Sequence, residues 1–394
     1  MNVAEQIVAQ LVDAGVHRIY GIVGDSLNPI VDAVRKTGGS KKGGIDWIHV
    51  RHEEAAAFAA SAEAQLTGKL AVCAGSCGPG NLHLINGLYD ANRTGAPVLA
   101  IASHIPSVQI GTMYFQETHP DRIFEECSVY NELISSAAQS PRTVNSAIRH
   151  AVGLGGVSVI TLPGDISDLK AVEHVPTYAP ARPATLAPNA TDIEEAAALL
   201  NKADKVAIFA GAGVEGAHDE VIALADALKA PIGHSLRGKH FIQYDNPFDV
   251  GMTGLLGYGA AAEGMNDADV LILLGTDFPY DQFLPSTPTI QVDTHAEKLG
   301  RRTDVDLAIH AQVKPFIEAL LPHLRAGRSD SFLKAKIKKH SEIMHAPVGA
   351  YTRNVEKMRP IHPEYAAHLL NETAAKDAIV TAATGMCNVW TARY

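Results

Sequence analysis

Short runs of consecutive apolar residues recur along this chain and constrain its fold more than any other feature. In the first part of the chain they occupy residues 18–24, 45–50, 70–75, 97–103 and 157–163. The runs are continuous rather than alternating, which is typical of strands buried on both faces of a parallel sheet. The segments between them have helical spacing, as at Val3, Ile7 and Leu11, and Gly15 is a candidate C-terminal cap. The pattern predicts an α/β fold with a doubly wound parallel sheet.

A second alternating block follows a proline-rich stretch. Its predicted strands occupy residues 205–211, 231–236, 270–275 and 289–293. The stretch before it contains Pro176, Pro180, Pro183 and Pro188, and proline at this density continues neither a helix nor a strand. We therefore expect successive doubly wound α/β domains. The expected boundaries are 1–170 for the first domain, 171–191 for a linker, 192–325 for the second domain, 326–360 for a second linker and 361–394 for the start of a third domain.

The last part of the chain offers too few elements for a core of its own. A helix over 362–375 and a strand over 378–384 are predicted there. One helix and one strand cannot bury a core, so we expect the opening of an α/β domain whose remainder is absent. Before it lies the basic segment 334–340, KAKIKKH, which we interpret as a solvated helix face in preference to a contact with an anionic surface.

Charge and cysteine content narrow the class of protein. The formal net charge of −10 disfavours nucleic-acid binding and favours small-molecule ligands. The four cysteines are too few for a disulfide framework, and no apolar run approaches the roughly 20 residues that a transmembrane helix needs. We expect a cytoplasmic protein without a transmembrane segment.

The stretch 50–64, VRHEEAAAFAASAEA, places two acids where a predicted strand turns into a helix. One interpretation is structural, because carboxylates in a first helical turn complement the positive end of the helix dipole. The other is functional and makes one of them a buried acid/base group. The motif does not match a zinc-protease helix, because Ala56 stands where that helix carries its second histidine.

Two other motifs leave alternatives open. The stretch 211–216, GAGVEG, has the glycine spacing of a dinucleotide-binding loop, but the next predicted strand offers no acid at its end. Dinucleotide binding and a plain strand-to-helix turn are equally compatible with it. Cys73 and Cys77 lack a second cysteine pair, so a tight turn is favoured over a zinc site.

Taken together, stretches in both blocks resemble the thiamine diphosphate-dependent enzymes, and specifically their pyruvate oxidase and pyruvate:quinone oxidoreductase branch. The matching stretches are, in chain order, 21–30, 51–64, 73–91, 110–120, 157–166, 233–239, 244–259, 273–280, 361–365 and 384–394. The resemblance implies a first domain that binds the aminopyrimidine of thiamine diphosphate, a Rossmann-like second domain that binds FAD, and a third that anchors the diphosphate through magnesium. It implies oxidative decarboxylation of pyruvate to acetate and carbon dioxide, with a quinone as electron acceptor, in a homo-oligomer (a dimer or tetramer).

The resemblance also assigns roles to particular residues. The acid at Glu53 is implied to hydrogen-bond the aminopyrimidine and so to promote loss of the thiazolium proton, while Glu54 keeps the helix-start role. His83, Phe115 and Gln116 are implied to surround the reacting carbon. The implied FAD contacts are Arg237, Thr253, Gly254, Leu255, Gly275, Thr276, Asp277, Phe278, Pro279, Tyr280 and Asp293.

The chain departs from this family at its end. The family holds magnesium through a Gly-Asp-Gly stretch followed by an asparagine, and nothing after Tyr394 supplies them. We therefore expect no metal ligand in this chain, and activity only beside a chain that supplies the missing domain. Ala383 also stands where the family usually has an aspartate. The alternatives are an FAD-binding remnant without decarboxylase chemistry and an acetolactate synthase-like carboligase.

Overall fold

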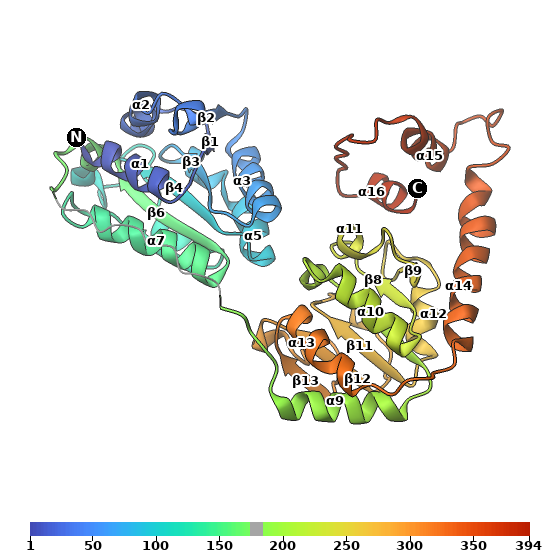
Figure 1. Cartoon of the computed structure of the whole chain (residues 1–394). Helices are drawn as coiled ribbons and strands as arrows, with labels where there is room; N and C mark the ends of the chain where they lie inside the picture. The colour runs from blue at the N-terminus through green and yellow to red at the C-terminus, as the bar shows by residue number, and fades with distance from the viewer. Residues whose placement is uncertain (174–183) are drawn as a thin grey trace. The chain divides into compact units, whose positions relative to one another are not determined.

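The computed structural model describes residues 1–173 and 184–394, which divide into two compact units, Met1–Pro183 and Ala184–Tyr394 (Figure 1). Three of the prolines in the expected linker, Pro176, Pro180 and Pro183, lie outside the described residues. The residues just beyond them already belong to the second unit, because the amide of Gln312 donates to the carbonyl of Leu186 at 2.9 Å.

The first unit is built on a six-stranded sheet with the order β2-β1-β3-β4-β6-β5. Its strands are β1 (Arg18–Gly21), β2 (Asp46–His49), β3 (Ala71–Gly75), β4 (Val98–His104), β5 (Tyr130–Leu133) and β6 (Val157–Pro163). All neighbouring pairs are parallel. The prediction of a doubly wound parallel sheet is therefore confirmed, and β5 is an additional edge strand that the apolar runs do not reveal.

Helices cover both faces of this sheet. The unit contains α1 (Val3–Asp13), α2 (Asn28–Lys36), α3 (Glu53–Thr67), α4 (Pro79–Leu82), α5 (Ile85–Thr94), α6 (Pro120–Ile123), α7 (Ser140–Leu154) and α8 (Gly164–Asp168). Val72 and Ala74 of β3 pack with residues of α1, α2 and α7, whereas Ala71 and Cys73 pack with α3 and α5. Because successive residues of β3 serve opposite cores, the strand needs an apolar residue at every position.

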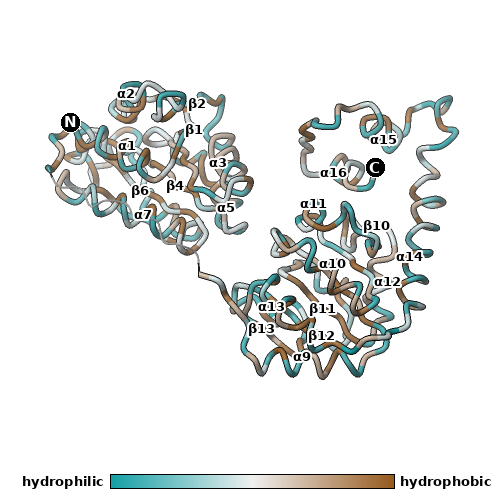
Figure 2. Tube along the Cα trace, viewed as in Figure 1, coloured by the Kyte–Doolittle hydropathy of each residue, from teal (hydrophilic) through white to brown (hydrophobic). Residues whose placement is uncertain are grey.

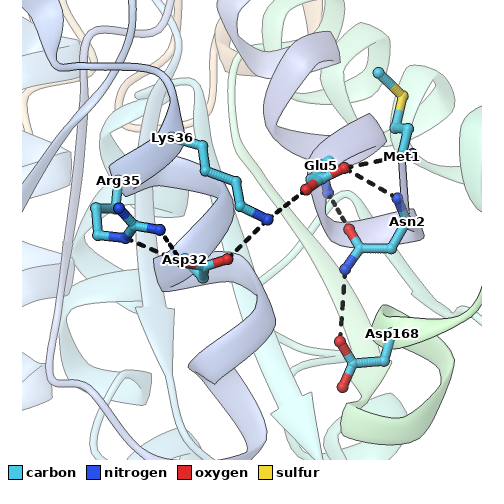
Figure 3. Close-up of polar contacts among 7 residues, drawn as sticks. All are labelled: Met1, Asn2, Glu5, Asp32, Arg35, Lys36 and Asp168. Carbon is cyan, nitrogen blue, oxygen red and sulfur yellow. Dashed lines mark hydrogen bonds and ion pairs between the residues drawn. The ribbon is translucent and has the colours of Figure 1, made fainter.

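Polar side chains fasten α1 to its neighbours (Figure 3). Asn2 and Glu5 form a capping box at the start of α1, in which each side chain accepts from the other residue's amide. Lys36 of α2 bridges Glu5 at 2.6 Å and Asp32 at 2.9 Å, and its hydrogen bond lowers the pKa of Glu5. These contacts set where α1 and α2 lie relative to each other on the sheet.

The second unit contains a seven-stranded sheet with the order β10-β9-β8-β7-β11-β12-β13. Its strands are β7 (Val206–Ala210), β8 (Ile232–His234), β9 (Asp249–Met252), β10 (Tyr258–Gly259), β11 (Val270–Leu274), β12 (Thr289–Asp293) and β13 (Leu307–His310). Only β10 runs antiparallel to its neighbour. The six parallel strands follow the 3-2-1-4-5-6 order of Rossmann sheets, and the order reverses between β7 and β11.

Helices again cover both faces. The unit contains α9 (Ala190–Lys202), α10 (His218–Leu228), α11 (Lys239–Ile242), α12 (Ala261–Asn266), α13 (Val313–Leu320), α14 (Ser331–Ile343), α15 (Pro363–Thr373) and α16 (Met386–Arg393). α9, α10 and α13 share one core with alternate residues of β7 and β11, while Met265 of α12 and Phe332 of α14 pack on the other face. In Figure 2 the trace of α9 alternates between apolar and polar residues, as a helix with one buried side requires.

The basic segment 334–340 forms part of α14, so the stretch expected to be a linker includes a helix that packs on the second unit. Lys336 is 5% exposed, and its ammonium group contacts Glu263 at 2.7 Å and Asp267 at 2.5 Å. Lys338 keeps the solvated position expected of such a face, with a side chain 79% exposed. The segment therefore combines one buried lysine with exposed ones.

The strand predicted over 378–384 is wrong. These residues form no strand, and Ile379 is 93% exposed and Val380 58% exposed. A β-strand is stabilised by backbone hydrogen bonds to a neighbour, and no strand of the described residues pairs here. α16 instead packs on the second unit, where Ala392 contacts Met252 and Tyr258. In the described part of the chain, no helix is long and apolar enough to cross a membrane.

Candidate functional site

The candidate site lies at the carboxyl edge of the first sheet, next to the point where its strand order reverses. β1 and β3 are neighbours, with β2 on one side and β4 on the other. In doubly wound sheets, ligands bind in the crevice outside the carboxyl ends of the strands at such a switch point. The segments that follow these four strands carry Glu53, His83 and Gln116.

Glu53 is the first residue of α3 and is 8% exposed. Its Oε2 atom lies 3.0 Å from Nδ1 of His83, which follows α4. A Cβ atom on Gly80 would stand 3.3 Å from Oε1 of Glu53, so a glycine leaves room beside the carboxylate. The fold thus brings a desolvated carboxylate and an imidazole together from two different loops.

The neighbouring residues have different positions. His52 is the N-cap of α3, where Nδ1 accepts from the Glu54 amide at 3.2 Å, and its ring stacks on that of His83 at 4.3 Å. Glu54 accepts a hydrogen bond from Asn86 at 2.8 Å and is partly exposed. Glu53 therefore points to the carboxyl edge of the sheet, whereas Glu54 joins the helix surface to α5.

The loop after β4 carries the expected residues Phe115 and Gln116, which are both exposed. Gln116 has a left-handed backbone conformation, with φ +65°, and its Cβ atom lies 2.9 Å from where a Cβ on Gly78 would be. Its Oε1 atom is 3.5 Å from the thiol of Cys77, the residue before Gly78. Phe115 is 78% exposed and lies on the surface.

Small buried polar residues hold these segments in place, and the sequence analysis missed them. The hydroxyl of Ser26 lies 3.0 Å from that of Ser76 and accepts from the amide of Cys77. Ser103, at the end of β4, donates to the Ser26 carbonyl at 2.6 Å, and Asn81 donates to the Ser103 carbonyl at 2.6 Å. No pattern in the sequence marks these residues, because single small polar residues occur throughout the chain.

The residues expected to contact a flavin also meet at one edge of a sheet, in the second unit. Arg237, Thr253, Gly254, Leu255, the segment 275–280 and Asp293 all stand at or beyond the carboxyl ends of parallel strands. A Cβ on Gly254 would lie 2.8 Å from the Phe278 ring, so the turn after β9 touches the segment after β11.

Within this set, exposure separates three groups. Thr253, Thr276, Phe278 and Asp293 are buried, whereas Arg237, Leu255 and Pro279 are exposed and Gly254, Gly275, Asp277 and Tyr280 are intermediate. Phe278 belongs to the core, with its ring 5.1 Å from that of Phe209. Asp277 forms ion pairs with Arg301 and Arg302, and Asp293 accepts from the His295 amide at 2.9 Å.

The structure gives a packing reason for the glycines of GAGVEG. The amide of Gly213 donates to the carbonyl of Gly275 at 2.9 Å, and a Cβ on Gly213 would lie 2.6 Å from the Cα of Gly275. The backbones after β7 and β11 therefore touch directly. This backbone contact by itself requires glycines at these positions, so the glycine spacing is not evidence for a bound dinucleotide. Dinucleotide binding is supported instead by the strand order of the sheet.

In the described residues, Cys73 and Cys77 belong to no group of three metal-ligating side chains. Cys73 is buried in the core, and burial raises the pKa of its thiol to about 12. In the described residues, the group that brings three metal-ligating side chains together is His52, Glu53 and His83.

Comparison with known proteins gives matches along most of the chain. Residues 1–123 match the profile "Thiamine pyrophosphate enzyme, N-terminal TPP binding domain", and residues 193–320 match "Thiamine pyrophosphate enzyme, central domain". The first profile covers the loops with Glu53, His83 and Gln116, and the second covers the Rossmann-ordered sheet.

Three relatives illustrate the range of similarity. An uncharacterized 42.6 kDa protein of Pseudomonas amyloderamosa is 54% identical over 85% of this chain and 84% of its own length. A "Putative thiamine pyrophosphate-containing protein" of Bacillus subtilis is 36% identical over 99% of this chain and 67% of its own length. A pyruvate oxidase of Lactiplantibacillus plantarum is 30% identical, and the match spans 62% of that enzyme. Acetolactate synthases match as well.

Proposed function

Because the chain belongs to the thiamine pyrophosphate enzymes, we propose that it binds thiamine diphosphate at Glu53 and serves the oxidative decarboxylation of pyruvate. The reaction would yield acetate and carbon dioxide, with FAD and a quinone accepting the electrons. The similarity to a pyruvate oxidase supports this substrate, although the chain spans 62% of that relative's length.

The observation that carries the proposal is the environment of the Glu53 carboxylate. It is almost fully buried, and its ion-pair partner in the described residues is the imidazole of His83 rather than a lysine or arginine. A buried carboxylate is costly unless it is hydrogen-bonded, and the ring nitrogens of an aminopyrimidine would supply that partner. The residues present therefore fit the cofactor.

When bound, thiamine diphosphate supplies the electron sink that decarboxylation of a 2-oxo acid needs. The contribution of this chain is to hold and move protons around it. Glu53 would hold a proton against the ring, and a partly exposed His83 would exchange protons with solvent. Gln116 would offer an amide to the oxygen of the substrate.

FAD binding is proposed for the second unit. The Rossmann strand order and the buried Asp293 at the end of β12 support it, because such an acid accepts hydrogen bonds from a ribose hydroxyl. Thr253 and Thr276, buried at the carboxyl ends of β9 and β11, would contact the cofactor through their hydroxyl groups. Magnesium, which the diphosphate of this cofactor requires, and assembly as a homo-oligomer also belong to the proposal.

An acetolactate synthase-like carboligation is a second candidate, since acetolactate synthases match the chain at 28% identity. A third is a flavin-binding protein without decarboxylase chemistry. The products distinguish the three: acetate with a reduced acceptor, acetolactate without one, or no consumption of pyruvate.

The test compares Glu53→Gln with Glu54→Gln, two substitutions of identical chemistry at adjacent positions. Because activity is expected only beside a chain that supplies a diphosphate-binding domain, the chain is paired with a longer relative whose own counterpart of Glu53 is replaced by glutamine. In this pairing, thiamine diphosphate binding is measured by calorimetry with Mg²⁺, and carbon dioxide release from labelled pyruvate is measured with FAD and a soluble quinone. We expect Glu53→Gln to reduce release by about 10²-fold or more, with Glu54→Gln close to the unsubstituted protein. Equal loss in both variants, or no carbon dioxide release by the unsubstituted chain in this pairing, would overturn the proposal.

A further inference from the structure

We propose that His52, Glu53 and His83 form a binding site for a single Zn²⁺ ion. Each residue offers one ligand atom, and these atoms all lie within 4.8 Å of one another. His52 and Glu53 come from the start of α3, and His83 comes from the end of α4. The fold therefore assembles the trio from two loops at the carboxyl edge of the first sheet.

The chemistry of the three side chains suits zinc. Two imidazole nitrogens and one carboxylate oxygen are ligands that Zn²⁺ accepts, and three protein ligands leave a fourth position for water. Tetrahedral zinc with bonds of 2.0–2.1 Å places its ligand atoms about 3.3 Å apart. Nδ1 of His83 and Oε2 of Glu53 are already 3.0 Å apart, so this pair needs almost no movement.

His52 is the ligand that must move. Its ring stacks on that of His83 with centroids 4.3 Å apart and planes inclined by 25°, so the in-plane lone pairs of the two rings do not converge on one point. The side chains of His52 and His83 are 50% and 43% exposed, which leaves both free to turn. Nδ1 of His52 accepts from the Glu54 amide, so coordination through Nε2 keeps this helix-capping contact and coordination through Nδ1 replaces it.

Electrostatics favours a cation at this point. Glu53 is 8% exposed, and its ion-pair partner in the described residues is the imidazole of His83 rather than a lysine or arginine. A divalent ion between the three groups would neutralise the negative charge of the carboxylate. It would also interact with the carboxylate oxygens in place of the water that burial has removed. The site has no recognisable sequence motif. Ala56 occupies the position where a zinc-binding helix has its second histidine, and the second imidazole comes instead from His83, 30 residues after Glu53.

The site has a consequence that rests on the proposed function. Zinc and the aminopyrimidine ring of thiamine diphosphate would both need the Glu53 carboxylate. The two ligands should therefore exclude each other, and the apparent dissociation constant of thiamine diphosphate should rise linearly with the free Zn²⁺ concentration.

The primary test uses metal alone, so it does not depend on thiamine binding. Untagged chain is titrated with Co²⁺, whose tetrahedral complexes absorb strongly in the visible range, and with Zn²⁺ by calorimetry. We compare His52→Ala, His83→Ala and Glu53→Gln with a control, His368→Ala. His368 is a partly exposed histidine that contacts Glu372 at 3.1 Å on α15, so it resembles the site in composition but lacks a third ligand.

We expect one micromolar site in the unsubstituted chain, at least tenfold weaker binding in each site variant, and no change in the control. Because the chain has 18 histidines, some Co²⁺ or Zn²⁺ binds weakly at other histidines, and His368→Ala measures how much one such histidine contributes. Millimolar binding only, or tight binding that survives His83→Ala, would overturn the zinc site. Far-ultraviolet circular dichroism of each variant shows that lost binding does not reflect lost folding.

Discussion

Nδ1 of His83 lies 3.0 Å from Oε2 of Glu53, although 30 positions separate the two residues in the sequence. The contact joins the start of α3 to the end of α4 and sets a buried carboxylate against a half-exposed ring. A carboxylate in this position lowers stability unless a ligand completes its hydrogen bonds.

We therefore expect Glu53→Gln to leave the free energy of unfolding unchanged or to raise it by up to about 1 kcal/mol, because it removes a buried charge and keeps the shape. Urea denaturation followed by circular dichroism measures this, with Glu54→Gln as the control. A loss of stability at Glu53 greater than at Glu54 would show that the carboxylate serves the fold and not a ligand.

The backbone contact between Gly213 and Gly275 gives a second prediction. Gly275 has φ +55° and Gly216 has φ +70°, but only Gly275 is crowded, since nothing lies within 4 Å of a Cβ on Gly216. Alanine at either position carries the left-handed strain of about 1 kcal/mol. Gly275→Ala should cost about 1–3 kcal/mol more through overlap with Gly213.

Hydrogen exchange of peptides from β7 and β11 measures this difference locally. Protection of these strands should fall in Gly275→Ala and stay nearly unchanged in Gly216→Ala. Equal behaviour of the two variants would mean that the loops separate easily and that the close approach is not needed.

The buried Lys336 gives a prediction with a pH dependence. Burial lowers the pKa of Lys336, but hydrogen bonds to Asp267 and Glu263 outweigh it, so the pKa is raised above 10.5. Since a raised pKa in the folded state favours the charged form, the stabilisation is complete below pH 10.5 and is lost as the pH rises through the folded-state value. Lys336→Met should cost about 1–2 kcal/mol near pH 8.

Unfolding by urea at pH 8 and at pH 11 or above tests both parts of this prediction. The difference between the unsubstituted chain and Lys336→Met should shrink at the higher pH. Lys338→Met, on the same helix at a side chain 79% exposed, is the matched control and should have little effect at either pH. A similar loss in both variants would contradict the buried ion pair.

Thiol reactivity gives a fourth prediction. Cys73, Cys77 and Cys127 are buried, and burial raises the pKa of the Cys73 thiol to about 12 and that of Cys127 to about 11. Cys387 is partly exposed. One thiol should therefore react quickly with a disulfide reagent at pH 8, and Cys387→Ser should abolish that phase. Rapid reaction of more than one thiol in the folded chain would contradict the burial of the other three.

Apolar runs predicted nine strands of the two sheets, because strands buried on both faces need apolar residues throughout. They missed four strands: β5, whose sequence YNEL is polar and lies at an edge, the edge strands β10 and β13, and β9, which lies inside the sheet next to β10. They wrongly predicted a strand at 378–384, since an apolar run forms a strand only beside a partner. Apolar runs in the sequence indicate which residues are buried, whereas hydrogen-bonded pairing between strands depends on how the whole chain folds.

The candidate site was predictable only in part, for a related reason. Glu53 could be singled out from the resemblance, but its contact with His83 depends on two loops that meet after folding. Ser26, Asn81 and Ser103 have no pattern that marks them in the sequence, because single small polar residues occur throughout any chain. Their importance becomes visible when their hydrogen bonds are traced between loops.

Those hydrogen bonds have a consequence for how a ligand is received. Ser26 and Ser103 connect the segments after β1, β3 and β4 before anything binds, so the crevice is already assembled. A ligand entering it would order few additional backbone torsions, and the entropic penalty of association would come mainly from the ligand itself. Ser26 and Ser103 would thus increase affinity by holding the carboxyl edge of the first sheet in place, without touching the ligand.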